Sequence, residues 1–267
     1  MAIDTSVFAL SGKVGDLIFT QGKKRTYVSK KSGKPHQLSE NSKKSANDLG
    51  EASMHSRIVR AAFAGFVEIY KDSGIHYRLN KCFLAALKPI PKQDLGEKKV
   101  KNGDVAVLKG FRFNQDVRLE GLLYKLPNVN IDPGGQLKIN LSVEPEENIT
   151  KVVKNADQVV LQIGIFSHNL DDGTYQFIKL KDLVKPKLKS AKTTIHFNLK
   201  GEILLLVVMG VHYQKNGKRN QTKELNAAEI THVFRLSDGE NVEFVTEIEE
   251  AISVPLQNEG LAWDEEE

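Results

Sequence analysis

The chain has 267 residues, of which 40% are hydrophobic and 27% charged, a composition typical of a globular protein that can bury a core. Its single cysteine, Cys82, excludes an internal disulfide and a cysteine-based zinc site. The N-terminus lacks the basic start and apolar run of a secretory signal. The longest apolar run, Ile203–Val211, is much shorter than the roughly 20 residues that a membrane-spanning helix needs. We therefore expect a cytoplasmic or particle-associated protein without a membrane span.

The charge is unevenly distributed along the chain. Residues 237–267 contain eleven acidic residues and no Lys or Arg, so the net charge of +4 separates into −11 for this segment and +15 for residues 1–236. Such asymmetry is typical of a protein with a basic face that binds anions or an acidic partner. An acidic tail can cover that face. The alternative interpretation is a charged, disordered end that serves solubility.

The N-terminal residues predict a β-hairpin followed by a basic arm. Val14–Thr20 and Arg25–Ser29 are strand-like, and Gln21-Gly22-Lys23-Lys24 between them suits a hairpin turn. Lys30–Lys44 is polar and basic, which is typical of an arm or linker. We assign residues 1–35 to this hairpin and arm.

Two helices are predicted next. The first covers about Ala46 to Phe66, with Asp48 and Glu51 spaced as in a capping box. The second covers about Ile75 to Leu87 and stops before a proline. Their apolar stripes are formed by Leu49, Ala52, Ser56, Val59 and Phe63 in the first helix and by Leu79, Cys82, Phe83 and Ala86 in the second. We assign residues 36–92 to a helical hairpin.

Short β-like runs separated by turn signals follow. They are Val105–Leu108, Gly110–Phe113, Gln136–Val143, Gln158–Phe166, Thr174–Leu180, Thr193–Leu199, Ile203–Tyr213, Ile230–Leu236 and Val242–Thr246. Ile203–Val211 lacks polar alternation, which predicts a central strand buried on both faces, with Gln158–Phe166 as its neighbour. We expect an α+β fold in which the N-terminal β-hairpin and helical hairpin precede an antiparallel β-sandwich of residues 93–250 and an acidic tail of residues 251–267.

No motif of catalysis or cofactor binding is found in the sequence. Gly12-Lys-Val-Gly15 lacks the length and the Lys-Ser/Thr ending of a phosphate-binding loop. Three histidines on predicted strands, His196, His212 and His232, have no acidic residue at a spacing that completes a metal site. Cys82 lies on an apolar helix side without a base beside it. We therefore predict that the protein is not an enzyme and uses no cofactor, metal or small-molecule substrate.

The two ends of the chain hold the candidate partner-binding residues. These are Lys23, Lys24, Arg25, Tyr27, Lys30, Lys31 and Lys34 in the basic arm, and Trp263, Asp264 and Glu265 in the tail. Opposite charges at the two ends favour docking on a neighbouring subunit. Cations with an interleaved aromatic residue also suit phosphate contacts of nucleic acid, although no nucleic-acid-binding motif is found. A solvated hairpin is the third interpretation.

Several short motifs resemble an uncharacterised protein family found in Bacteroidetes genomes. They are Gly12-Lys-Val-Gly15, Tyr27-Val28, Ala52-Ser53 with Arg60-Ala-Ala-Phe63, Tyr77-Arg78-Leu79, and Gly110-Phe-Arg-Phe-Asn114. The resemblance is best up to about residue 120. The family's hairpin usually continues Tyr-Val-Arg, whereas this chain has Ser29, which weakens the case for an anion contact there. The resemblance implies the architecture and a bacterial or phage context, but no activity.

The sequence thus favours a non-enzymatic structural or assembly protein, a self-associating subunit of a phage-like or filamentous particle. The first alternative is a nucleic-acid-binding accessory protein that uses the basic arm. The second is a ligand- or carbohydrate-binding β-sandwich, which rests on fold analogy alone.

Overall fold

The computed structural model describes residues 2–4, 11–22, 25–31, 37–68, 70, 72–132, 136–142, 150–153, 156–185, 190–197 and 200–244. The chain divides into two compact units, Met1–Lys43 and Lys44–Glu267. The helical hairpin and the β-rich part therefore belong to one unit, and the N-terminal strands form another.

The first unit is a small antiparallel sheet in the order β1-β4-β3-β2. Its strands are β1 (Ala2–Asp4), β2 (Gly12–Val14), β3 (Leu17–Gln21) and β4 (Thr26–Lys30). The predicted pairing across Gly22 is confirmed, because Phe19 lies opposite Val28. The continuous strand expected over Val14–Thr20 is wrong. A turn at Gly15, whose φ is +57°, folds Val14 back onto Leu17.

Both predicted helices are present, and all but the first four residues of the first one belong to the second unit. They are α1 (Glu40–Val67) and α2 (Ile75–Ala86). The start of α1 lies six residues before the expected one, within the segment expected to be an arm. The predicted stripe is confirmed at Ala52 and Phe63, which are fully buried, and is wrong at Leu49, which is 46% exposed.

The pair Asp48 and Glu51 does not form the expected capping box, because α1 begins eight residues before Asp48. Instead, one carboxylate oxygen of Asp48 accepts hydrogen bonds from the backbone N–H groups of Gly96 and Lys98. Glu51 likewise accepts one from the N–H of Val100, at 3.2 Å. The two acids therefore fix the loop after α2 against α1, which explains why Asp48 is buried and Leu49 is not.

The largest sheet is antiparallel and follows the order β14-β13-β11-β7-β8, with β12 paired to β11 and β9 paired to β7. Its strands are β7 (Gln158–Asn169), β8 (Tyr175–Lys179), β9 (Leu183–Lys185), β11 (Glu202–Lys215), β12 (Lys218–Arg219), β13 (Asn226–Ser237) and β14 (Glu240–Asn241). The predicted central position of Ile203–Val211 is confirmed, and so is its pairing with β7.

Alternation along β11 creates two separate cores. Leu204, Leu206 and Val208 point into a cluster with the apolar sides of α1 and α2. Leu205 and Val207 point into a second cluster on the opposite face. Because both faces are covered, the strand is apolar at consecutive positions.

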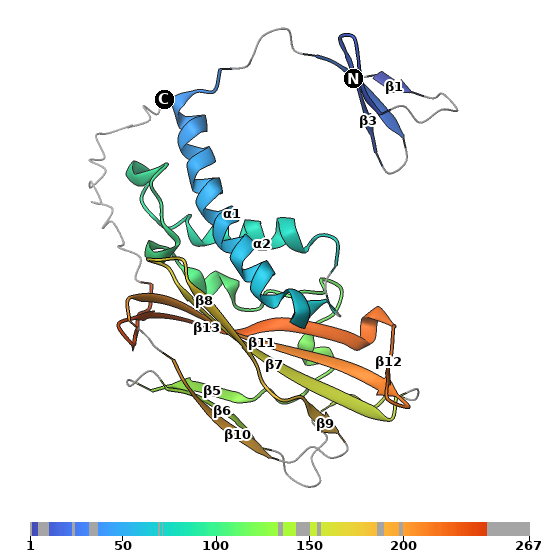
Figure 1. Cartoon of the computed structure of the whole chain (residues 1–267), viewed down its shortest axis with the longest axis vertical. Helices are drawn as coiled ribbons and strands as arrows, with labels where there is room; N and C mark the ends of the chain where they lie inside the picture. The colour runs from blue at the N-terminus through green and yellow to red at the C-terminus, as the bar shows by residue number, and fades with distance from the viewer. Residues whose placement is uncertain are drawn as a thin grey trace, which may run out of the picture. The chain divides into compact units, whose positions relative to one another are not determined.

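The second cluster also contains side chains of a smaller antiparallel sheet in the order β10-β6-β5. Its strands are β5 (Asn128–Ile131), β6 (Gln136–Leu141) and β10 (Ala191–His196). Figure 1 shows α1 and α2 over one face of the large sheet, and β5, β6 and β10 on its other side.

Two of the expected strands are wrong. Val105–Leu108 forms a 3₁₀ helix, η3, because the side chain of Asp104 accepts a hydrogen bond from the N–H of Ala106 and turns the chain. Gly110–Phe113 contributes only one bridge, between Arg112 and Glu229. The other short 3₁₀ helices are η1 (Lys92–Asp94), η2 (Val100–Asn102), η4 (Leu119–Gly121) and η5 (Lys223–Leu225). The strand expected over Val242–Thr246 is not formed at residues 242–244, and its last two residues lie outside the described part.

Taken over the described residues, the fold is a mixed α+β fold in which strands dominate. None of the helices in this part of the chain combines the length and the apolar character needed to cross a bilayer.

Candidate functional site

One face of the N-terminal sheet carries four apolar side chains, and no second layer packs on it within the described residues of the same unit. The register places Val14 opposite Leu17 and Phe19 opposite Val28, and alternation puts all four on the same face. Val14 is 64% exposed and Leu17 is 43% exposed, while Phe19 and Val28 are half-buried. Among the described residues of this unit with a known exposure, only Thr26 is buried. A sheet normally buries one face against another layer, so this face is a candidate contact surface.

The structure places four of the predicted partner-binding residues on this sheet or directly beside it. Arg25, Tyr27, Lys30 and Lys31 are all exposed. Alternation along β4 directs Tyr27 to the face opposite the one that carries Lys30, so the predicted residues do not form a single patch. The others lie outside the described residues: Lys23, Lys24, Lys34, Trp263, Asp264 and Glu265.

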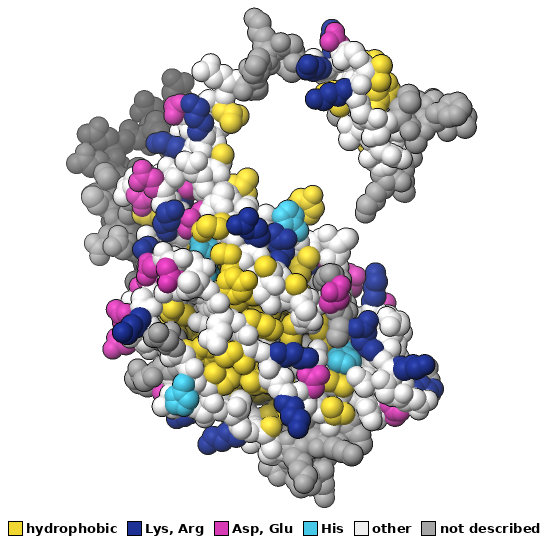
Figure 2. Space-filling model, in the orientation of Figure 1, with side chains coloured by type: hydrophobic (Ala, Val, Ile, Leu, Met, Phe, Trp, Pro, Cys, Tyr) yellow, Lys and Arg dark blue, Asp and Glu magenta, His cyan; other side chains and the backbone are white. Residues whose placement is uncertain are grey.

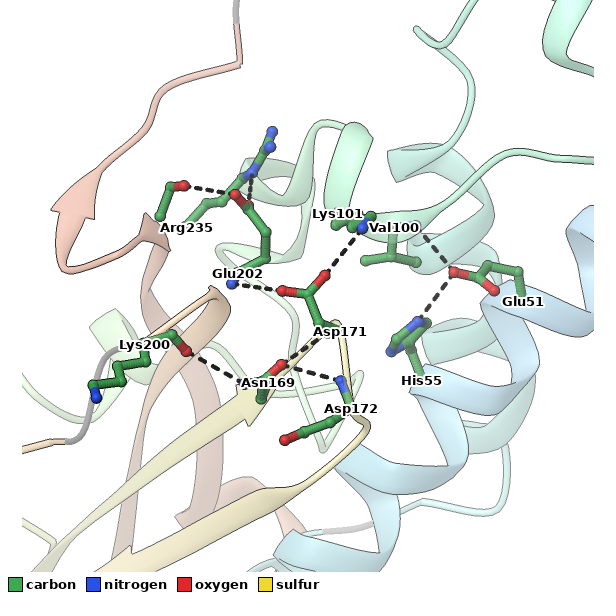
Figure 3. A network of polar contacts seen from close by, with 11 residues as sticks. Glu51, His55, Val100, Lys101, Asn169, Asp171, Asp172, Lys200, Glu202 and Arg235 are labelled. Carbon is green, nitrogen blue, oxygen red and sulfur yellow. Dashed lines mark hydrogen bonds and ion pairs between the residues drawn. The ribbon is translucent and has the colours of Figure 1, made fainter.

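The second unit holds a buried line of polar side chains that joins α1 to β7. The carboxylate of Glu51 lies 3.3 Å from Nε2 of His55, and Nδ1 of His55 lies 2.9 Å from Nε2 of His168. Nδ1 of His168 lies 3.0 Å from the carbonyl oxygen of Thr174. Both histidines are buried, at 2% and 0% exposure. Figure 3 shows Glu51 between His55 and Val100.

The partners determine which atom donates in each bond of this line. A carbonyl oxygen only accepts, so His168 donates from Nδ1. Burial lowers the pKa of His168, so its Nε2 stays unprotonated and accepts from His55. Burial works to raise the pKa of Glu51, but hydrogen bonds from His55, Lys99 and the N–H of Val100 outweigh it and hold that pKa at about 2. Since Glu51 is therefore ionised and only accepts, His55 donates to it from Nε2.

A second network lies beside the first one and ties the turn after β7 to its neighbours (Figure 3). Asp171 accepts from Nζ of Lys101 at 3.0 Å and from the N–H of Glu202 at 3.1 Å. Glu202 in turn accepts from Nε of Arg235 at 3.3 Å. These hydrogen bonds lower the pKa of Asp171, although the carboxylate is exposed. The network fixes the ends of β7, β11 and β13 to one another.

A third polar line crosses the other end of the large sheet. The hydroxyl of Tyr70 donates to Oε1 of Gln162 at 2.9 Å, and Nδ1 of His212 lies 3.1 Å from the same hydroxyl. Because the tyrosine proton is used on Gln162, His212 donates from Nδ1, and its Nε2 accepts from Gln214 at 3.1 Å. Burial lowers the pKa of His212 to about 4, which agrees with this neutral form. Gln162 completes the line by donating to Asp182 at 2.8 Å.

Tyr70 reaches this position because Gly210 has no side chain. A Cβ at Gly210 would lie 2.8 Å from the hydroxyl oxygen of Tyr70. Burial also raises the pKa of the Tyr70 hydroxyl strongly. Tyr70 is therefore a permanent donor at neutral pH, and its role is to join α1 to the sheet.

The other candidates from the sequence do not come together. His212 and His232 both lie in the large sheet, on β11 and β13, while His196 lies on β10 of the small sheet. Among the described residues, no group of three or more His, Cys, Asp or Glu side chains is arranged to hold a metal ion. Cys82 is half-buried against the helical core, and burial raises the pKa of its thiol, which disfavours the reactive thiolate.

Two of the cavities in the described part of the second unit differ in their lining. One, of about 180 Å³, lies between the two sheets and is lined mainly by aliphatic side chains such as Leu141 and Leu180. The other, of about 190 Å³, is polar and is lined by residues that include Asp72, Asp116 and Arg219. The lining of the first cavity contains no aromatic ring, the usual platform for a sugar.

Sequence reasoning did not identify His55, His168, Tyr70 or Gln162. His55 and His168 are 113 positions apart, and each has an ordinary apolar or β-like neighbourhood in the sequence. The one local signal was the pair Asp48 and Glu51, which was interpreted as a cap of its own helix rather than as a tie to a distant loop.

No family model, curated protein or solved structure matches this chain. The resemblance of the short sequence motifs to a Bacteroidetes family therefore stays a prediction.

Proposed function

We propose that this protein is a non-enzymatic structural subunit that self-associates through its N-terminal sheet. The observation that carries the proposal is the uncovered apolar face formed by Val14, Leu17, Phe19 and Val28. A few short strands are stable in water only when an apolar face packs on another layer. The function of the sheet is therefore to contact a partner.

The partner in this proposal is a second copy of the same sheet. An apolar face is self-complementary, so two copies related by a two-fold axis bury the same residues on both sides. The product is a pair of sheets about 10 Å apart with interdigitated side chains. Lys30, which shares this face, lies at an exposed position where it can reach the solvent.

The finer description of the second unit as a β-sandwich is part of the same proposal. Its support is the cluster that joins Ile139 and Leu141 of the small sheet to Ile163, Leu205 and Val207 of the large sheet. In this description the helical hairpin covers the outer face of the larger layer.

The wider role that we propose is that of a subunit of a phage-like or filamentous particle. A two-fold contact alone gives only a dimer, so growth requires a second contact between unlike surfaces. The acidic segment of residues 237–267 supplies a surface of opposite charge to the remainder of the chain. The polar lines through His55 and His212 support a structural role, because their members bond to one another.

Nucleic-acid binding is a second candidate function, favoured by the exposure of Arg25, Lys30 and Lys31. Such binding would weaken steeply as salt is raised, because bound cations release counterions from the phosphates. The placement of Tyr27 and Lys30 on opposite faces of β4 does not form a single platform, so self-association is preferred.

The test is the mass of the full chain in solution, measured by size-exclusion chromatography with light scattering. We expect a dimer or larger species that Leu17→Lys converts to monomer, because a charge would be buried in the contact. Thr20→Lys is the matched control, since Thr20 is exposed on the opposite face of the same strand. A monomeric wild-type chain, or equal effects of both variants, would contradict the proposal. Excess absorbance at 260 nm that salt removes would favour nucleic-acid binding instead.

A further inference from the structure

The outer face of the helical hairpin is cationic and carries exposed apolar side chains. Between Ala52 and Val67 of α1, and throughout α2, there is no acidic residue. Nδ2 of Asn80 donates to Oγ of Ser53 at 3.3 Å, which fixes the contact between the two helices. Figure 2 shows Lys and Arg side chains together with hydrophobic ones over this region.

Helical spacing brings the exposed residues of this face together. Arg57 lies one turn after Ser53 on α1, and Tyr77 lies one turn before Asn80 on α2. The hydrogen bond between Ser53 and Asn80 thus places both turns close to the point where the two helices meet. Tyr77 is 76% exposed, and Lys81 follows it on the same side of α2.

The cations of this face are not neutralised within the described part of the chain. Arg57 and Lys81 form no ion pair with any described residue, and the same holds for Lys88 after α2. The face thus combines three unpaired positive charges with an exposed aromatic ring. It suits a segment that carries carboxylates and apolar side chains in alternation.

The C-terminal segment of this chain has that composition. Residues 245–267 contain eight acidic residues and no Lys or Arg. Its larger apolar side chains lie between them: Val245, Ile248, Ile252, Val254, Leu256, Leu261 and Trp263. The charge of the segment is therefore opposite to that of the hairpin face.

The segment also leaves the described part of the chain close to α2. Val242, Glu243 and Phe244 line the same cavity as Gly103–Ala106. The N–H of Asp104 donates to the carbonyl of Ala86, the last residue of α2, at 2.9 Å. The 23 residues after Phe244 can extend over about 75 Å, whereas the 12 residues of α2 rise by only about 18 Å.

We propose that residues 245–267 dock on the α1–α2 face of their own chain, with the carboxylates on Arg57, Lys81 and Lys88 and an apolar side chain on Tyr77. This contact is separate from the one assigned to the N-terminal sheet and does not depend on it. It competes with the contact between subunits proposed for the acidic segment, because one copy of the segment makes only one of the two contacts at a time. It differs from the expectation that the acidic tail meets the basic arm, which stays a prediction.

Trp263 gives a direct measurement, since it is the only tryptophan of the chain. The experiment measures quenching of its fluorescence by acrylamide, a neutral quencher, in the full chain and in a free peptide of residues 245–267. We expect the full chain to protect Trp263 at low salt, and to lose that protection at about 1 M salt, where the screening length falls to about 3 Å. The protection should not change on dilution, because the contact is within one chain.

Two double variants decide where the segment binds. Arg57→Glu with Lys81→Glu should expose Trp263 to the level of the free peptide. Lys151→Glu with Lys192→Glu is the matched control, since both lysines are exposed and Lys192 lies on β10, on the opposite side of the large sheet. Circular dichroism checks that both variants are folded. Protection that survives the first pair, that disappears on dilution, or that is absent at low salt would overturn the proposal.

Discussion

Nδ1 of His55 and Nε2 of His168 lie 2.9 Å apart in the interior, and this contact joins a helix near the N-terminus to a strand in the middle of the chain. Only one proton occupies the space between the two nitrogens. Nε2 of His55 contacts Glu51, whose carboxylate also binds Lys99 and the N–H of Val100. The helix, the loop after α2 and the large sheet are therefore connected through one carboxylate.

Replacing that carboxylate should destabilise the protein. Glu51→Gln keeps the shape but replaces the ionised acceptor of three hydrogen bonds by a neutral amide, and we expect a loss of about 2 kcal/mol in the free energy of unfolding at pH 7. Chemical denaturation at pH 7 measures this loss. Glu40→Gln is the control, because Glu40 forms only an exposed pair with Lys43 and should change stability by less than about 1 kcal/mol. Equal effects of the two substitutions would show that the buried line contributes nothing.

The same carboxylate should produce acid sensitivity. The pKa of Glu51 is about 2 in the folded chain and is lowered from 4.5, so its contribution is complete above about pH 4.5 and is lost as pH falls toward 2. Thermal unfolding between pH 5 and pH 2.5 should therefore show a smaller decrease for Glu51→Gln than for the wild type. A parallel decrease in both proteins would contradict the ionised state of Glu51.

His212 should make the protein less stable below neutral pH. Its pKa is lowered from 6.5 to about 4 in the fold, so the unfolded chain takes up the proton first as pH falls. The stabilisation is complete above about pH 6.5 and decreases through the range down to pH 4, by on the order of 2 kcal/mol. His212→Asn, which can still donate to Tyr70 but does not titrate, should have a flatter profile. His196→Asn, at an exposed position, should retain the wild-type slope.

A methyl group at Gly210 should displace Tyr70. Because the added Cβ would lie 2.8 Å from the Tyr70 hydroxyl oxygen, Gly210→Ala should cost about 1–3 kcal/mol. Gly50→Ala is the matched control, since a Cβ there meets nothing within 4 Å and Gly50 lies inside α1. That change should stabilise the chain by about 0.5–1 kcal/mol, because alanine favours the helix. Thermal unfolding measures both changes. Melting temperatures above that of the wild type for both variants would contradict the prediction.

The side chain of Lys98 should contribute more to the free energy of unfolding than that of its neighbour Lys99. Nζ of Lys98 donates to the carbonyl oxygens of Leu87 and Ile90, at 3.2 and 2.6 Å, and satisfies acceptors just after α2. Lys98→Met leaves these buried acceptors without the charged donor, which should cost about 2 kcal/mol in chemical denaturation. Lys99→Met removes one exposed partner of Glu51 and should cost about 1 kcal/mol or less. A larger loss for Lys99→Met would reverse this assignment.

Features encoded by neighbouring residues were predictable from the sequence. The hairpin around Gly22 follows from its turn residues, and the second helix from its apolar periodicity. The pairing of β7 with β11 follows from two apolar runs that suit neighbouring strands buried on both faces. The segment Val105–Leu108 was misassigned because its apolar residues fit a strand, whereas the side chain of Asp104 closes a turn. Four-residue and shorter strands such as β5 and β12 carry too little periodicity to be identified.

The candidate contacts were predictable only in part. The exposure of Arg25 and Tyr27 agrees with a hairpin that faces solvent, but the apolar face beside them depends on the register between Val14 and Leu17, which the turn at Gly15 sets. The buried lines were not predictable at all. Tyr70 and His212 are 142 positions apart, and only the folded sheet brings them within hydrogen-bonding distance.

The contact between Phe63 and Phe166 also has a consequence for synthesis on the ribosome. Their ring centroids are 5.5 Å apart in the core under α1, but Phe166 is translated about a hundred residues after Phe63. At 5–20 residues per second, the apolar side of α1 therefore waits roughly 5–20 seconds before the strand that covers it is made. During this interval Phe63 and Phe66 lack the strand that buries them, so the nascent chain has an apolar segment that the finished protein conceals.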